Sequence, residues 1–543
     1  MSPSEARTGS CVKKTRTATE RSTRSSAQPS LMRPVRMRSH LDGCLRSHEA
    51  RSASGGERGT VVTDLDDAMR LSRILSREKK PLEKNDLYFE GEQPLRFLSP
   101  ILQQELGFRL SPIVINLALF SVDVYDNRLD IEGFRVQSTE RTTVGADGLF
   151  AKSVVANSSA DADVRDTWQE NDGPFISQQA HRESLALGRA YAMVGGGDSA
   201  GDAPVITIES PFDAIHEDDP RTKRVRHGLK KWTDPDKTKW MTLLRGDGST
   251  ITWYQRGGQW VEETADATDA NDQKLCALVP LANDVRVLGR SRPGKFDQRL
   301  GRSVFSPIIS PLDALNKIAS DMMVSAEFHA LPRRWATGLD EGDFVDENDE
   351  PMDTFSMIAG RMWGTKNDKA HFGQFPEAEL SNFHNTMKLL MQVVAMQLGL
   401  PSHYLLFQGD NPPSADAIRS SEAQLVKRAE RKQQALSTRW EMVQRLALME
   451  LGRSEDARPK MIETTWRDPS TPTIAQKADA IVKLVQAKDN SGRSILPIEQ
   501  AREDLGYTDI EQDRMRDWDE NAVQDAQIAA AMRGLDNVAG GVS

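Results

Sequence analysis

His403 and Tyr404 are the adjacent residues of this chain that come closest to a catalytic pair. An imidazole beside a phenol could move a proton in general acid–base catalysis. No G-x-S-x-G nucleophile elbow accompanies them, and no two of the nine histidines stand at metal-ligand spacing with a carboxylate. We therefore favour a structural or loop role for His403, and we expect no catalytic residue and no metal site.

A phosphate-binding loop is the second candidate, because Gly195, Gly196 and Gly197 form a triplet. Glycine-rich turns cradle phosphates where they join a strand to a helix. The chain contains no G-x-x-x-x-G-K-[ST] segment and no G-x-G-x-x-G segment after a strand. We interpret the triplet as a flexible turn and expect no bound cofactor.

Two runs of charge could bind an ion or DNA. The acidic run Asp340–Asp353 is rich in carboxylates, which are calcium and magnesium ligands, but its Gly and terminal Glu are misplaced for an EF-hand loop. The run Lys427–Lys432 (KRAERK) could contact phosphates. A solvated acidic loop and a solvated helix face with internal ion pairs are the favoured interpretations.

Length and charge indicate a large acidic protein of several domains. The 543 residues are 38% hydrophobic and 28% charged, and no apolar run approaches the roughly 20 residues of a membrane span. With 12 Lys/Arg and five Asp/Glu in the first 58 residues and a net charge of −10 overall, the rest of the chain carries −17. Such a body disfavours tight static DNA binding but is compatible with an acidic wall past which DNA slides. The three cysteines imply no disulfide framework and fit a reducing compartment.

Residues 1–60 are rich in Ser, Arg and Thr and lack apolar periodicity, so we expect them to be disordered. They could be a basic arm for nucleic acid, a transit-like peptide, or translated sequence upstream of the true start. We favour the last, because Glu57-Arg58 can be encoded by a purine-rich, ribosome-binding-like stretch. Val61 or Val62 could then be a GTG initiator.

The first half of the remaining chain predicts an α+β body that ends near Pro280–Asn283. Helical spacing of apolar residues marks three segments: 64–77, 112–129 and 163–194. A short strand is expected at 130–136. Further short strands separated by turn residues are expected at 205–209, 225–232, 240–244, 250–255 and 259–261.

The second half is predominantly helical. Ser310-Pro311 opens a helix to Ala330, the segment 333–376 is irregular, and Ser381 caps a helix that Gly399 ends. After the loop 402–414, Ser414 caps a helix of about 37 residues, a rod of roughly 55 Å. We expect a rod so long and polar only in a protein where it spans a large assembly. Its apolar stripe is Ile418, Leu425, Ala429, Leu436, Val443 and Ala447. Helices at 473–487 and 497–505 and a polar tail follow.

Several blocks in the same order give the chain a close resemblance to the portal proteins of tailed phages, of the actinobacteriophage siphovirus type. The similarity runs from about Val62 to about Trp518. Its most specific blocks are Tyr88–Leu98, Asn127–Val136, Pro311–Gly338, Gly373–Leu390, Leu398–Gln433 and Trp466–Ala487.

The resemblance implies a ring-forming portal fold, typically with twelve subunits, at one vertex of the capsid. Residues 61–300 would form the wing, 301–331 and 379–400 the two stem helices, and 332–378 the clip. Residues 401–414 would be the tunnel loop at the channel constriction, 415–452 a long wing helix, 453–520 the crown, and 521–543 a flexible tail.

The resemblance also implies the function and partners: a conduit for double-stranded DNA during packaging and ejection. The clip would dock terminase and then the head–tail adaptor, while the ring would contact the major capsid and scaffolding proteins. The protein would belong to the virion and assemble in the host cytoplasm, without a membrane. Two alternatives stay open, a DNA-processing enzyme such as a terminase-like nuclease or ATPase, and another head–tail connector component.

For a conduit, an acidic wall would repel the duplex and keep it centred, because each tight phosphate contact would add a barrier to movement. A few basic residues of the stem and clip would relieve the repulsion. The candidates, chosen by position, are Lys317, Arg333, Arg334 and Lys388. The tunnel-loop candidates are His403, Tyr404, Gln408, Gly409, Asp410, Asn411, Pro412 and Pro413.

Overall fold

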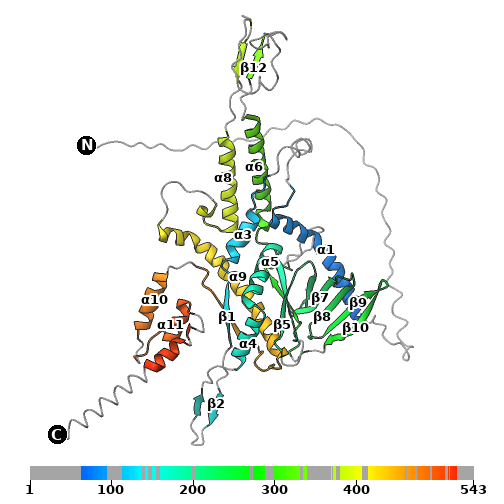
Figure 1. Ribbon diagram of the computed structural model, residues 1–543, viewed down its shortest axis with the longest axis vertical. Coiled ribbons are helices and arrows are strands. Elements are labelled where there is room, and N and C mark those ends of the chain that lie inside the picture. Colours follow the sequence, from blue (N-terminus) through cyan, green and yellow to red (C-terminus); the bar gives the residue numbers. More distant parts are fainter. Residues whose placement is uncertain are drawn as a thin grey trace, which may run out of the picture. The chain divides into compact units, whose positions relative to one another are not determined.

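The computed structural model describes residues 63–94, 113–136, 141–144, 150–153, 159–197, 202–268, 271, 273–287, 299–329, 334–338, 369, 371–374, 380–405, 414–458, 462–470, 474–488, 492–507, 511–512 and 514–522. The chain divides into two units, Met1–Val61 and Val62–Ser543, and all described residues belong to the second. The predicted basic segment 1–60 lies outside them. In the second unit helices and strands are mixed, as the sequence predicts (Figure 1).

Helix α1 (Asp64–Glu90) begins at a capping box. The Thr63 side chain accepts a hydrogen bond from the Asp66 amide, and the Asp66 carboxylate accepts one from the Thr63 amide. The helix runs past its predicted end at Arg77 and through Pro81, whose ring costs a helix interior roughly 3 kcal/mol. It continues because apolar side chains on both sides of this proline are buried, and it ends at Gly91 with a φ of 77°.

One face of α1 packs on a five-stranded antiparallel sheet of strand order β10-β9-β8-β7-β6. The strands are β6 (Ala214–Asp218), β7 (Val225–Thr233), β8 (Lys239–Arg245), β9 (Thr250–Arg256) and β10 (Gln259–Thr268). Four of them confirm predicted strands. The fifth, β6, was not predicted, because its five residues have little alternation of polar and apolar side chains.

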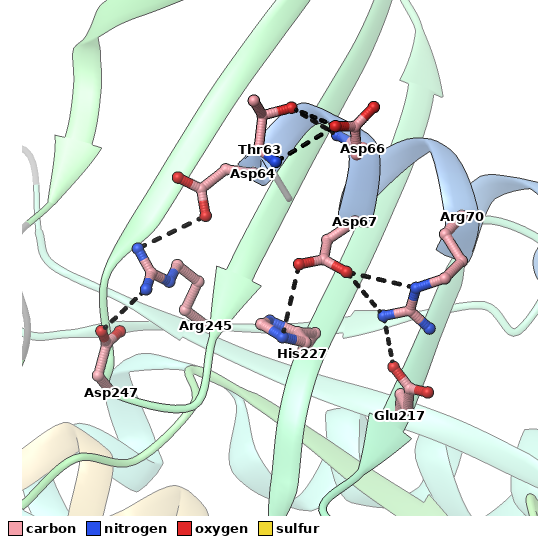
Figure 2. A network of polar contacts seen from close by, with 9 residues as sticks. All are labelled: Thr63, Asp64, Asp66, Asp67, Arg70, Glu217, His227, Arg245 and Asp247. Carbon is pink, nitrogen blue, oxygen red and sulfur yellow. Dashed lines mark hydrogen bonds and ion pairs between the residues drawn. The ribbon is translucent and has the colours of Figure 1, made fainter. Parts of the chain in front are cut away.

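Ion pairs fix the first turns of α1 to this sheet, as Figure 2 shows. The Arg70 guanidinium contacts Glu217 at 2.7 Å and Asp67 at 2.9 Å. Arg245 reaches Asp64 at 3.5 Å. Further along the helix, Leu71 and Leu75 make apolar contacts with the sheet. Ion pairs therefore attach the first turns of α1, and buried apolar side chains attach the turns that follow.

A three-stranded sheet corrects the predicted helix over 163–194. The structure has α4 (Ser159–Glu170) and α5 (Gly173–Leu187), and Gly188, with a φ of 97°, ends α5. Residues Arg189–Gly195 form β4, which pairs with β5 (Val205–Glu209) and with the unpredicted β11 (Leu278–Ala282). β4 is buried on both faces, so its sequence lacks the alternation that identifies a strand.

An aromatic cluster forms the centre of the main core, where α4, α5 and α9 (Ala415–Glu450) meet. Trp440 is fully buried; its ring meets Trp168 edge to face at 5.4 Å, and its indole N–H donates to His181 Nε2 at 2.8 Å. His181 also stacks on Trp466. This nitrogen must be unprotonated to accept, and burial lowers the pKa of His181 to about 3.

The long helix α9 confirms the predicted cap at Ser414 and most of the predicted apolar stripe. It packs against α4, β4, β5, β11 and β14 (Ile462–Trp466) of its own chain. Its length is therefore explained within one chain, and the sequence argument that such a rod requires an assembly is not needed. Strand β14, unpredicted, pairs with β1 (Ile131–Val136).

The remaining elements complete the described unit. Helix α3 (Leu117–Asp126) is shorter than the predicted 112–129, because the Asn116 side chain caps its start. The other elements are β2 (Arg141–Val144), β3 (Phe150–Ser153), η1 (Ser306–Ile308), α6 (Ile309–His329), β12 (Arg334–Thr337), β13 (His371–Gln374), α8 (Ser381–Leu398), η3 (Ser402–Tyr404), α10 (Ile474–Gln486) and α11 (Ile498–Leu505). The predicted helices at 310–330, 381–398, 473–487 and 497–505 are confirmed.

Candidate functional site

Helices α6 and α8 pack side by side (Figure 1), although 51 residues separate them in the sequence. Only one end of the pair is embedded in the main core, through residues on both helices. The buried residues are Leu312, Leu315 and Ala319 of α6 and Val394, Ala395 and Leu398 of α8. The start of α8 is mostly solvent-exposed, and Leu389 in its middle keeps 59% of its surface exposed. The pair thus has one end anchored in the core, while the start of α8 at the other end is exposed.

Polar contacts of two buried side chains anchor α6 to α1 and to the segment before α3. The Tyr88 hydroxyl at the end of α1 donates to Asp313 at 2.6 Å. The Asn316 side-chain oxygen accepts from the Ile115 amide at 2.9 Å, just before α3. Directional bonds therefore join α6 to α1 and to the residues that lead into α3.

A close backbone contact fixes the segment that leads into α6. Gly301 has a φ of 110°, and a Cβ placed there would lie 2.0 Å from the carbonyl oxygen of Gly188. The Asn283 amide donates to the same oxygen at 2.9 Å, and the Arg302 amide donates to the Asn283 carbonyl at 2.8 Å. Only glycine fits at 301, since both its φ and its surroundings exclude a side chain.

A two-stranded ribbon corrects the expectation that 333–376 is wholly irregular. Strands β12 and β13 pair antiparallel, with Arg334 opposite Gln374 and Thr337 opposite His371. The Trp335 ring lies against Gly373, where a Cβ would approach it to 2.3 Å. Most of the segment, including the acidic run Asp340–Asp353, lies outside the described residues.

Side chains from other elements complete the end of α8. Gly399 ends the helix with a φ of 71°, as predicted. The Tyr125 hydroxyl donates to the Leu398 carbonyl at 2.5 Å, and the Arg428 guanidinium donates to the Gln397 carbonyl at 3.1 Å. The carbonyls that a helix end leaves unsatisfied are therefore bonded by α3 and α9. The predicted cap at the other end is wrong: Leu380 holds the N-cap position and Ser381 is the first helical residue.

A triad of Arg128, Tyr404 and Glu422 joins the start of the segment between α8 and α9 to α9 and to the residues after α3. The Tyr404 hydroxyl donates to Glu422 Oε1 at 2.7 Å and accepts from Arg128 Nη2 at 3.0 Å. Arg128 and Glu422 also approach to 4.0 Å, and both side chains are about nine-tenths buried. Burial and the bond to Glu422 raise the pKa of the Tyr404 phenol. The triad therefore holds the start of this segment against α9.

Lys432 corrects the interpretation of the run Lys427–Lys432 as a wholly solvated face. Its ammonium donates to the Asn283 side-chain oxygen and lies 5.1 Å from the Tyr125 ring centre. Burial lowers the pKa of Lys432 to about 8. By contrast, Lys427 is exposed and pairs with Glu430 at 2.6 Å, as the favoured interpretation expects.

The structure separates the candidates chosen from sequence. Lys317 pairs with Asp321 one turn along α6, while Lys388 is exposed on α8. His403 is half-buried and meets the Tyr404 ring edge to face at 4.9 Å. Of Arg334 only the backbone is described. The other candidates lie outside the described residues: Arg333, Gln408, Gly409, Asp410, Asn411, Pro412 and Pro413.

The residues that organise this site were not found from sequence. Arg128 and Glu422 lie 294 positions apart, and neither belongs to a motif. A capped helix end at Gly399 was the one local signal, because it predicts that neighbouring donors must reach the last carbonyls. Among the residues that the structure describes, no group of three or more His, Cys, Asp or Glu side chains could hold a metal ion.

Comparison with known proteins identifies the family. Residues 70–525 match the family model described as phage portal protein, SPP1 Gp6-like. The chain belongs to this portal protein family. It is 29% identical to the portal protein of Mycobacterium phage D29 over 453 residues, which cover 82% of this chain and 86% of the relative. It is 28% identical to the portal protein of Mycobacterium phage L5 over 451 residues, which cover 81% and 85%.

The match confirms the predicted family and function, a portal protein of a tailed phage. Portal proteins are virion components and act within capsid-associated oligomeric assemblies, and the family is a structural one. None of the described helices is long and apolar enough to cross a membrane. The helix pair, its ribbon and the triad are therefore features of a portal protein.

Proposed function

We propose that this portal protein forms a ring, typically of twelve copies, at one capsid vertex, and that double-stranded DNA passes through its centre. The observation that carries the proposal is the pair α6 and α8, which is anchored in the core at one end and is partly to fully exposed in the remaining described residues. Identical copies of such a pair, set side by side about an axis, would border a channel.

The proposal assigns the chain to regions with the predicted boundaries. Residues 61–300 form the wing, 301–331 and 379–400 the stem, and 332–378 the clip. The tunnel loop is 401–414, the long wing helix 415–452, the crown 453–520 and the tail 521–543. The α1–sheet unit and the α9 core support the wing assignment, because both are rigidly packed.

Within this arrangement the triad of Arg128, Tyr404 and Glu422 fixes the start of the tunnel loop. The bonds from Tyr125 and Arg428 hold the end of α8 in the same way. A load on the loop would therefore be transmitted to α3 and α9 rather than to α8 alone.

The net charge of the chain supports a channel through which DNA moves without being bound tightly. Residues 59–543 carry a net charge of −17, so a wall made of them repels phosphate. Lys317 is neutralised by Asp321, and Lys388 is the exposed stem cation among the described residues. We propose that Lys388, Arg333 and Arg334 make the few transient phosphate contacts.

The clip, of which β12 and β13 form one ribbon, would bind terminase and later the head–tail adaptor, while the wing would contact capsid and scaffolding proteins. Assembly would take place in the host cytoplasm, and the ring itself would have no catalytic role. Electron microscopy of the purified full chain tests the proposal directly. Rings with an axial hole are expected, and isolated globules at all concentrations would overturn it.

A further inference from the structure

The module formed by α10, α11 and the helical residues 514–522 has very little core of its own. Among its described residues, Ile481 and Ala501 are the only apolar side chains that are buried. Seven large apolar side chains are instead between 39% and 62% exposed: Val482, Leu484, Ile495, Ile498, Leu505, Tyr507 and Trp518. A helical module of about 50 residues needs more burial than this to be stable.

The exposed apolar residues continue the faces that already pack. Ile498, Ala501 and Leu505 follow one another at helical spacing on α11, with the middle residue buried and the outer two exposed. On α10, Leu484 flanks the buried Ile481. The contact between the two helices is thus part of a wider apolar surface that a further element must cover.

Polar contacts inside the module fix its shape without covering this surface. Arg502 on α11 pairs with Asp519 at 2.7 Å, and the Gln512 side chain donates to the Tyr507 carbonyl at 3.0 Å. Trp518, next to Asp519, remains 62% exposed. The polar contacts therefore hold the helices of the module together, but much of its apolar surface stays exposed.

The distribution of charge indicates which partner covers the apolar surface of the module. Residues 474–496 contain four Lys/Arg and two Asp/Glu, whereas residues 497–522 contain three Lys/Arg and nine Asp/Glu. The net charges are +2 and −6, so one half of the module attracts the other half of an identical module. Lys477 and Leu484 lie seven residues apart on one flank of α10, which makes this flank both basic and apolar.

We infer that the α10 half of one copy docks on the acidic half, with Trp518, of the neighbouring copy, and that this contact completes the fold of the module. The contact is head-to-tail, so every copy in a closed ring uses both halves once. The inference rests on the proposed ring. It adds that the module at residues 474–522 depends on the neighbouring copy for its burial. Burial of the apolar residues supplies affinity, and the opposite charges select the orientation.

Hydrogen exchange tests the coupling between folding and assembly. Peptides from residues 474–522 of the full chain are compared between the monomer and the assembled ring. We expect exchange in these peptides to slow at least about tenfold on assembly, because each 1.4 kcal/mol of added stability is a factor of ten. Equal exchange in the two forms would overturn the inference while leaving the ring intact.

Charge reversal tests the orientation. The variant Lys477→Glu/Lys488→Glu should need about a tenfold higher protein concentration to assemble, and adding Glu511→Lys/Asp517→Lys should restore assembly. The control Lys239→Glu/Arg256→Glu reverses two exposed charges on the five-stranded sheet and should change nothing. Failure of the quadruple variant to regain assembly would contradict the head-to-tail contact. Failure of the wild type to form rings would instead refute the proposed function.

Discussion

The Tyr404 hydroxyl lies 2.7 Å from Glu422 Oε1, so one hydrogen bond joins the start of the segment between α8 and α9 to α9 itself. Arg128 of the α3 end donates to the same hydroxyl. Arg128, which is 276 residues from Tyr404, is thus held together with two residues that are 18 positions apart. The contact thus lies in the first residues of the proposed tunnel loop.

Tyr404→Phe removes both hydrogen bonds and leaves the buried Glu422 carboxylate without this donor. We expect the free energy of unfolding to fall by about 1–3 kcal/mol, measured by urea denaturation of the monomer. Tyr507→Phe is the control, because Tyr507 is exposed. Equal stability of Tyr404→Phe and wild type would show that the triad does not hold the segment.

Deletion of Gln408–Pro413 tests the role of the loop itself. Because the triad and the end of α8 lie outside the deleted residues, we expect rings to assemble normally while DNA packaging into capsids fails. A same-length Gly/Ser replacement of these residues separates loop length from loop sequence. Loss of rings in the deletion variant would count against a purely channel-facing role.

Gly301→Ala should be strongly destabilising. A methyl group there would overlap the Gly188 carbonyl oxygen at 2.0 Å, and the φ of 110° disfavours any side chain. We expect a loss of about 3 kcal/mol or more in the free energy of unfolding. Gly133→Ala is the matched control, since a Cβ at Gly133 meets nothing within 4 Å. A small effect at Gly301 would mean that the α6 connection can relax.

Acid should destabilise the protein through its buried histidines. Burial lowers the pKa of His181 and of His216 to about 3, because each imidazole loses its contact with water on folding. The folded state then binds fewer protons than the unfolded state below about pH 6.5, the pKa of an unperturbed histidine. Stability therefore falls as the pH drops from about 6.5 toward 3, by about 1.4 kcal/mol per pH unit for each histidine.

The variant His181→Gln isolates one of these histidines. Its amide oxygen can still accept from Trp440, so the variant should lose less stability than wild type between about pH 6.5 and 5, with a slope smaller by about 1.4 kcal/mol per pH unit. His384→Gln on the exposed face of α8 is the control. Asp126 acts in the opposite direction: burial raises its pKa to about 6, so it adds stability as the pH falls from about 6 to 4 in both variants. Parallel pH profiles for His181→Gln and wild type would contradict the assignment.

Alkali should stabilise the protein through Lys432. Its pKa of about 8 lies below that of an exposed lysine, so the unfolded state binds more protons between pH 8 and about 10.4. Stability contributed by this group therefore rises with pH from about 8 upward. Lys432→Met should abolish that rise in urea denaturation between about pH 7.5 and 9.5, whereas Lys427→Met, at an exposed site, should keep it. An unchanged rise in Lys432→Met would show that another group titrates.

Local signals in the sequence determined most elements of this protein. The caps at Ser414 and Gly399 and the apolar spacing of α6, α8 and α9 are properties of neighbouring residues, so they predicted those helices closely. The ordered blocks of resemblance predicted the portal family, which the comparisons confirm.

Only the tertiary structure revealed the strands β4 and β14 and the hydrogen bonds of the site. A strand buried on both faces has no alternation to reveal it, and β14 exists because β1 pairs with it across the chain. Lys427 and Lys432 belong to one charged run, yet Lys427 is exposed to solvent and Lys432 is partly buried and bonded to Asn283. The meeting of Arg128, Tyr404 and Glu422 has the same origin: hydrogen bonding and burial depend on distances between segments, and spacing along the chain does not encode those distances.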